Sequence, residues 1–200
     1  MAMAGTGTGG LPPPVLLDLL RSTTREVHER LHSHRGLAAV KAGTIGRAEY
    51  VALLRRLHGF HRPFEVATGT GPERSHWLEA DLAVFGVDRA MCSAHPACRA
   101  FPHRASPGYI LGAHYVVEGS ALGGRGLARQ LDGLLGTDVI AGRRFFSGHG
   151  ATTAIVWRAY LTRLSAAPNE PAEHAAVIAG AAATFAIFEQ WLKGWNGRDE

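Results

Sequence analysis

Glycine is concentrated in one otherwise apolar segment, between Gly108 and Gly126. Gly119 and Gly123 lie four residues apart, so in a helix they would share one face. Each glycine inside a helix costs about 1 kcal/mol relative to alanine. A chain that accepts this cost usually needs close approach to its main chain, either by another helix or by a flat ligand. The pattern alone leaves both interpretations open.

Histidine is the second feature with chemical potential, since the chain contains 11 of them. Residues 28–32 read His-Glu-Arg-Leu-His, which matches the zinc-protease pattern His-Glu-x-x-His. In such a site both histidines bind zinc and the glutamate polarises a water molecule. The longer form of the motif needs glycine and histidine where this chain has Arg35 and Ala38. Zinc hydrolysis therefore remains an alternative, although the sequence around the motif offers no third zinc ligand.

The other interpretation treats His28 alone as a metal ligand. The same helical face carries Arg21, Thr24 and Leu31. An axial histidine beside an apolar slot, with an arginine two turns away, suits a flat hydrophobic disc with acidic side arms. Haem fits that description, although a lone histidine on a helix is more often satisfied by hydrogen bonds.

Two cysteines and a histidine form a third pattern, Cys92-x-x-His95-x-x-Cys98. Zinc sites normally require a fourth ligand and a paired spacing, so this pattern is a weaker metal candidate. Two unpaired thiols are typical of a reducing compartment.

Composition favours one globular domain. The chain has 200 residues, 46% of them hydrophobic, and a net charge of +4 with a pI near 9.5. This mildly basic balance suits an anionic ligand, and no dense Lys/Arg run predicts nucleic-acid binding. Residues 1–13 are expected to be a disordered tail, not a signal peptide. No apolar run is judged long enough to span a bilayer, which predicts a cytoplasmic protein without membrane association.

Helical periodicity recurs along most of the chain, and no alternating run indicates a strand. The sequence therefore predicts a single all-α domain over residues 14–196, with a loop over 94–107 and a connector over 136–150 that has a short helix near Val139. The six main predicted helices are 15–33, 47–66, 73–85, 107–135, 152–164 and 171–195.

Three motifs, in this order, resemble the heme oxygenase family, and especially its bacterial members. Residues 20–28, Leu-Arg-Ser-Thr-Thr-Arg-Glu-Val-His, resemble its proximal helix. Residues 115–124, Tyr-Val-Val-Glu-Gly-Ser-Ala-Leu-Gly-Gly, resemble its distal helix and are the most specific of the three. Residues 145–150 with Trp157-Arg158, followed by Thr-Phe-Ala-Ile-Phe-Glu-Gln-Trp at 184–191, resemble its later helices. The resemblance implies an all-helical fold with haem between the first helix and a kinked, glycine-rich helix.

The resemblance also implies roles for particular residues. His28 would be the proximal iron ligand. The distal, catalytic wall would consist of Gly119, Ser120, Gly123 and Gly124. The haem-binding residues, including those facing its propionates, would be Arg21, Thr24, Tyr115 and Arg158.

The implied activity is oxidation of haem, as both cofactor and substrate, to biliverdin, ferrous iron and carbon monoxide. It requires O2, a redox partner protein and an external electron donor such as ferredoxin or an NADPH-dependent reductase. Haem-iron recovery or chromophore supply to a bacteriophytochrome apoprotein would be its purpose. The alternative is a haem-binding carrier or sensor that keeps the fold without turnover.

Two positions depart from the family pattern. Ser120 stands where many members have an aspartate that anchors a water molecule, which leaves the proton route open. His32 stands where many members have a carboxylate one turn beyond the proximal histidine. A carboxylate there would accept the second ring proton of His28.

Overall fold

The protein is an all-helical bundle, seen in a computed structural model that describes residues 13–195 and residue 197. The predicted tail lies almost wholly outside the described residues. Among those described there is no β-strand. In chain order the helices are α1 (Pro13–His32), α2 (Arg35–Lys41), α3 (Arg47–Thr68), α4 (Glu73–Ala83), α5 (Arg89–Ala94), α6 (Pro107–Gln130), α7 (Asp132–Leu135), α8 (Arg144–Ser147), the 3₁₀ helix η1 (Gly150–Thr152), α9 (Thr153–Ser165) and α10 (Pro171–Lys193).

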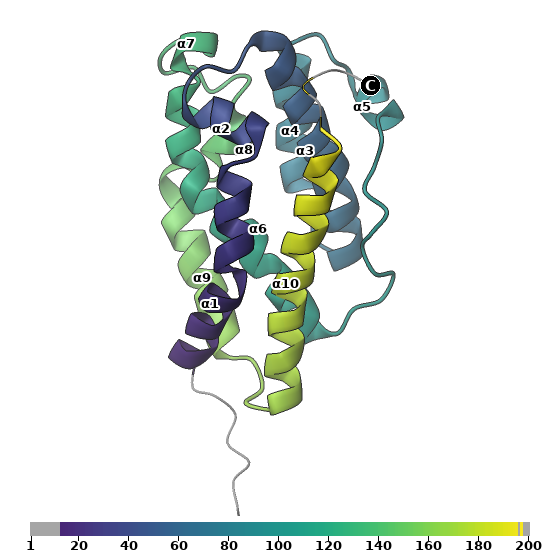
Figure 1. Ribbon diagram of the computed structural model, residues 1–200, viewed down its shortest axis with the longest axis vertical. Helices are drawn as coiled ribbons and strands as arrows, with labels where there is room; N and C mark the ends of the chain where they lie inside the picture. Colours follow the sequence, from purple (N-terminus) through teal and green to yellow (C-terminus); the bar gives the residue numbers. More distant parts are fainter. Residues whose placement is uncertain (1–12, 196, 198–200) are drawn as a thin grey trace, which may run out of the picture.

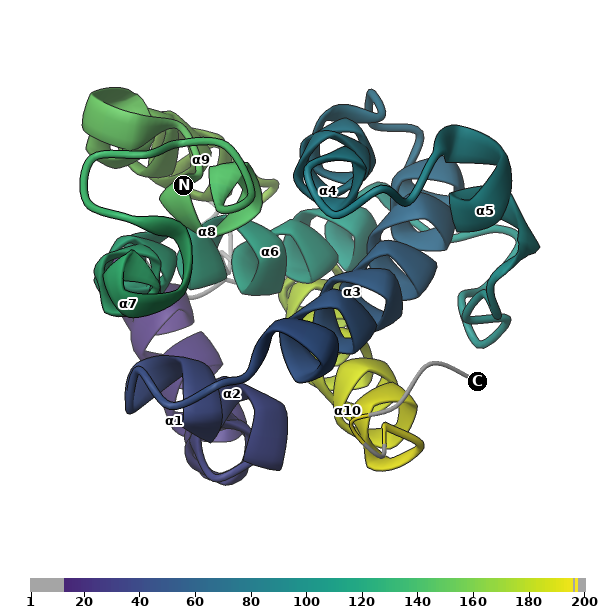
Figure 2. The same cartoon turned by 90° about the horizontal axis from the view of Figure 1, so that it is seen from above.

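Helix α6 crosses the middle of the molecule, and the other long helices are arranged around it (Figure 1). Helices α1 and α10 lie side by side on one face, while α9 and α4 lie on the other side of α6 (Figure 2). A bidentate ion pair joins α1 to α10: Arg30 Nε lies 2.6 Å from Glu189 Oε1, and Arg30 Nη2 lies 3.1 Å from Glu189 Oε2. This exposed pair lies beside the buried apolar cluster, including Leu20, Leu31 and Phe185, through which α1 packs on α10.

The closest helix crossing joins α6 to α10 through glycine. A Cβ atom placed on Gly112 would lie 1.8 Å from the carbonyl oxygen of Val177. One placed on Gly180 would lie 2.0 Å from the carbonyl oxygen of Tyr109. Both distances are shorter than any tolerable contact, so only glycine permits the two main chains to approach this closely. The helix-packing interpretation of the glycine pattern is therefore right for this part of α6.

The start and end of α6 have local causes. Ser106 caps it by accepting a hydrogen bond from the Tyr109 amide at 3.2 Å, and Pro107 occupies the first turn, where a missing N–H costs nothing. The helix ends at Gln130, and α7 follows the buried residue Leu131. The single helix predicted over 107–135 is therefore two.

Helix α8 is held against the bundle by a buried carboxylate. Asp81, on α4, accepts hydrogen bonds from the amides of Arg144 and Phe145 at 2.7 and 2.8 Å. These amides belong to the first turn of α8, which has no intrahelical acceptors for them. Burial raises the pKa of Asp81 to about 6, although the same two hydrogen bonds act to lower it.

The sequence prediction missed or misplaced the short helices. The short helix expected near Val139 lies instead at α8, and α2 and α5 were not predicted. Pieces of seven residues or fewer carry too little periodicity to identify, and their position depends on tertiary contacts such as that of Asp81.

Helix α10 corrects a second expectation. It has 23 residues, and an 18-residue stretch of it has a mean hydropathy of 1.5, so it is long and apolar enough to cross a membrane by length and composition. The prediction that no run has this length was wrong. In the bundle, α10 packs against α6, α1 and α3.

The crossing of α6 and α10 can be tested with one substitution and its control. Gly112→Ala should destabilise the protein by at least about 3 kcal/mol, because its methyl group would overlap the Val177 carbonyl. Gly126→Ala, on the same helix, meets nothing within 4 Å and should be neutral or stabilising by up to about 1 kcal/mol. Urea unfolding of both variants measures the difference, and equal stability would rule out the close crossing.

Candidate functional site

His28 lies on α1 between the buried core and solvent. Leu20 and Leu31 of the same helix are buried with Val116 of α6 in one hydrophobic cluster. The His28 ring is exposed enough to reach a ligand, and its centroid lies 6.2 Å from that of Phe185 on α10, edge to face. Phe185 is buried, and its ring forms one wall beside the candidate ligand.

The His28 ring is favoured in its neutral form. Partial burial lowers its pKa, and the neighbouring ring of His32 lowers it further, whereas Glu29 acts to raise it. The two imidazole centroids are 4.5 Å apart, edge to face. A metal ion binds the lone pair of neutral imidazole, so this environment prepares His28 as a ligand at neutral pH.

The face of α6 that contacts α10 at Gly112 is unfilled farther along the helix. Gly119 and Gly123 continue that face at spacings of seven and four residues. A Cβ atom on Gly119 would make only ordinary contact with the Trp157 ring, at 3.7 Å, and one on Gly123 would meet nothing within 4 Å. Gly123 is exposed, so bare main chain is available there to a flat ligand.

Helices α1 and α6 place His28 and Gly119 at the same level. The Tyr115 phenol of α6 is hydrogen-bonded to Thr24 of α1, and both helices run upward in Figure 1. His28 lies one turn beyond Thr24, and Gly119 lies one turn beyond Tyr115. The tertiary structure thus brings the imidazole and the bare glycine face to the same end of the contact between these helices.

Three of the predicted haem-binding residues lie together, and the fourth lies on a different helix. Burial raises the pKa of Tyr115, while the Thr24 hydrogen bond and the charge of Arg21 act to lower it. Arg21 is exposed and pairs with Asp18 at 3.3 Å. Arg158 is exposed on α9, next to Trp157, whose ring centroid lies 6.0 Å from that of Tyr115.

Gly124 has a packing role that the sequence did not indicate. A Cβ atom there would lie 2.8 Å from the carbonyl oxygen of Phe146, so Gly124 admits α8 against α6. It is buried, whereas Gly123 beside it is exposed. Its predicted place in the distal wall remains a prediction, but helix packing is sufficient to explain this glycine.

Ser120 is exposed next to the bare face, and its hydroxyl donates to the carbonyl oxygen of Val117 at 2.8 Å. With its hydrogen engaged inside the helix, the hydroxyl oxygen retains lone pairs that can accept from a water molecule.

The two zinc patterns gain no additional ligand from the fold. Over residues 13–195, no group of three or more His, Cys, Asp or Glu side chains is arranged to hold a metal ion. Cys92 and Cys98 are buried free thiols, and burial raises the pKa of each. The neutral thiol is therefore favoured, and a thiol must lose its proton to bind zinc.

Comparison with known proteins gives a family and a fold. A family model described as heme oxygenase matches residues 15–194. No curated protein matches the chain significantly. Among solved structures, heme oxygenase-1 from the cyanobacterium Synechocystis sp. PCC6803, crystallised in complex with heme, is similar, with a TM-score of 0.71 over 91% of this chain and 92% of that one. The two sequences are 16% identical, so this likeness concerns the fold.

Proposed function

The chain belongs to the heme oxygenase family, and on that premise we propose that it cleaves haem oxidatively to biliverdin, ferrous iron and carbon monoxide. One combination of features carries this proposal. His28 on α1 has a lowered pKa, and α6 has an unfilled stretch of main chain at Gly123. A neutral imidazole supplies an iron ligand, and main chain without side chains admits a flat ring. The residues present therefore fit haem.

Haem supplies the iron that activates O2 and also the porphyrin carbon at which the macrocycle opens. The protein's task is to hold the ring and to control its surroundings. His28 would hold the iron through the lone pair of its neutral ring. Gly119 and Gly123 would let the flat ring approach the main chain of α6, and their lack of side chains would keep acids and bases out of that space.

The polar residues around this slot divide into two groups. The Ser120 hydroxyl oxygen would accept a hydrogen bond from a water molecule and so hold a proton donor beside this slot. Arg21, Thr24, Tyr115 and Arg158 serve the haem periphery, where the arginines pair with propionate carboxylates. His32 lies beside His28 and replaces the carboxylate seen in many relatives as the polar neighbour of the ligand.

The reaction needs electrons from outside the chain, and a redox partner of the ferredoxin or NADPH-dependent reductase class supplies them. The product serves haem-iron recovery or provides the chromophore of a bacterial phytochrome, and we place the reaction in the cytoplasm. The rival function on the same fold is a haem carrier or sensor without turnover.

An aerobic haem titration tests the proposal. We expect purified protein to bind one haem, and added ascorbate or reductase in air to remove the Soret band while biliverdin and carbon monoxide appear. Product chromatography identifies the isomer, and an anaerobic sample serves as the control. A haem complex that survives reductant and O2 unchanged would identify a carrier, and failure to bind haem would overturn both functions.

Substitution of the two neighbouring histidines tests the ligand. His28→Ala should abolish turnover and change the iron spectrum, because it removes the axial nitrogen. His32→Ala should keep the axial bond and lower turnover by about 10- to 100-fold, the range for residues that act through a metal ligand. Absorption and electron paramagnetic resonance spectra distinguish the two variants. Loss of the axial nitrogen in His32→Ala alone would assign the ligand to the wrong histidine.

Gly123→Leu tests the bare face of α6. The apoprotein should keep its Tm, because nothing lies within 4 Å of the new Cβ atom. Haem affinity and turnover should fall by about 10-fold or more, or the cleavage position should change, because the side chain occupies the space of the ring. Gly71→Leu, in the open loop before α4, adds the same side chain and should leave both properties unchanged. Normal rate and product in Gly123→Leu would contradict close approach to the ring.

A further inference from the structure

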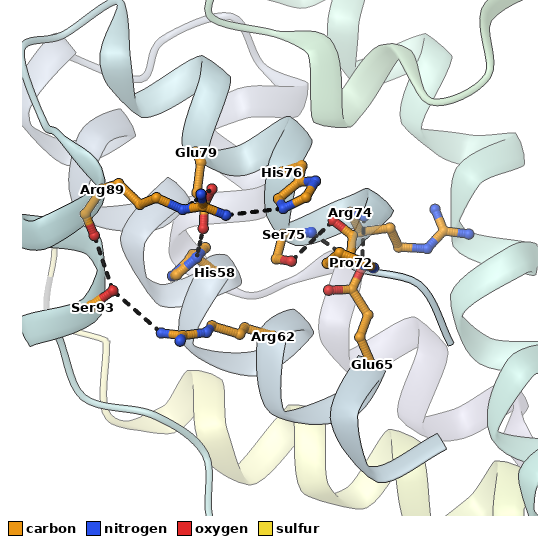
Figure 3. Close-up of polar contacts among 10 residues, drawn as sticks. All are labelled: His58, Arg62, Glu65, Pro72, Arg74, Ser75, His76, Glu79, Arg89 and Ser93. Carbon is orange, nitrogen blue, oxygen red and sulfur yellow. Dashed lines mark hydrogen bonds and ion pairs between the residues drawn. The ribbon is translucent and has the colours of Figure 1, made fainter. Parts of the chain in front are cut away.

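A polar cavity lies between α3, α4 and α5, and its polar residues are drawn in Figure 3. Its volume is about 300 Å³, at the lower end of the range for small-molecule sites. Its polar lining includes Arg62, Glu65, His76, Glu79, Arg89 and Ser93. None of these side chains takes part in the haem site described above.

Glu65 is the least satisfied group in this cavity. Only 4% of the residue is exposed. Its Oε1 atom accepts hydrogen bonds from the amides of Arg74 and Ser75 at 2.6 and 3.2 Å, which caps the start of α4. Its Oε2 atom is buried and has no hydrogen-bond partner in the described part of the chain. A buried carboxylate oxygen of this kind requires a donor.

Arg62 lies one turn before Glu65 on α3; its side chain extends toward Ser93, and that of Glu65 extends toward the start of α4 (Figure 3). Arg62 is exposed, and its Nη1 atom is 3.4 Å from the Ser93 hydroxyl oxygen, a long hydrogen bond. A guanidinium has five N–H groups, so most of its donors remain available to a ligand. An exposed arginine and a buried carboxylate thus line the same cavity with opposite charges.

The other two charged residues of the cavity neutralise each other. Arg89 Nε is 3.2 Å from Glu79 Oε2, and Arg89 Nη2 is 3.1 Å from His76 Nε2. Because a guanidinium only donates, His76 must accept at Nε2. Glu79 Oε1 also lies 3.4 Å from the buried His58 Nε2. Glu65 Oε2 and most of the Arg62 N–H groups are not used by these contacts.

We propose that this cavity binds a small zwitterion with an ammonium and a carboxylate group, the chemistry of a free amino acid. The ammonium donates to the buried Glu65 Oε2, and the carboxylate accepts from the exposed Arg62. Val66, 79% exposed and also lining the cavity, offers an apolar surface to the ligand's side chain. A lone anion would leave Glu65 without a donor, and the residues described provide no three-ligand group for a metal ion.

Titration of the 15N-labelled protein with the common L-amino acids, followed by amide NMR shifts, tests this site. We expect at least one to give saturable shifts at Ser75 and Ser93, with an affinity about tenfold or more above those of acetate and methylammonium. Glu65→Gln keeps an oxygen for the α4 amides but replaces the free acceptor with a donor, and it should weaken binding by about tenfold or more. Arg62→Gln should do the same, and Arg104→Gln, an exposed site outside the cavity, should not.

Three outcomes would overturn the proposal. Acetate or methylammonium could bind as tightly as any amino acid, which would make this a site for one charge. The absence of saturable shifts with every amino acid would mean that water satisfies Glu65. Binding could also survive Arg62→Gln unchanged. Because Arg62 is exposed, this variant decides the matter even if Glu65→Gln fails to fold. Haem turnover is measured separately and does not depend on the result.

Discussion

The contact of α6 with α10 at Gly112 and Gly180 is the constraint on which the rest of the bundle depends. Two main chains touch there with no room for a methyl group on either side. Helices with ordinary side chains at a crossing lie about 8–10 Å apart, so a glycine contact draws them closer than usual. Since α1 packs on α10 through the buried cluster that contains Leu20, Leu31 and Phe185, the position of α10 also sets that of the helix that carries His28.

Helix α6 uses glycine for different purposes along its length. Gly112 admits α10, and Gly124 admits the backbone of α8, which Asp81 holds in place. Gly119 and Gly123 meet no comparable backbone contact. The same residue type therefore builds the bundle at one level and leaves the helix bare at another, and only the surroundings distinguish the two cases.

Burial also divides the polar residues into structural and available groups. Asp81 is buried with a donor at each carboxylate oxygen, so it serves the fold. Glu65 is equally buried but has donors at only one oxygen. His28 is only partly buried, which lowers its pKa yet keeps its ring accessible. Each of the two proposed ligand sites is built on residues that have an unused lone pair or an unused hydrogen-bond donor.

The sequence by itself determined the long helices, the all-α class and the family, because helical periodicity and the spacing around His28 and Gly119 are local properties. It could not separate Gly112 and Gly124 from Gly123, since a glycine pattern does not show which neighbour fills the space. It also could not place α8, or find that Glu65 and Arg62 face a cavity with residues of α4 and α5. Those features depend on contacts between residues far apart in the chain, and only the tertiary structure decided them.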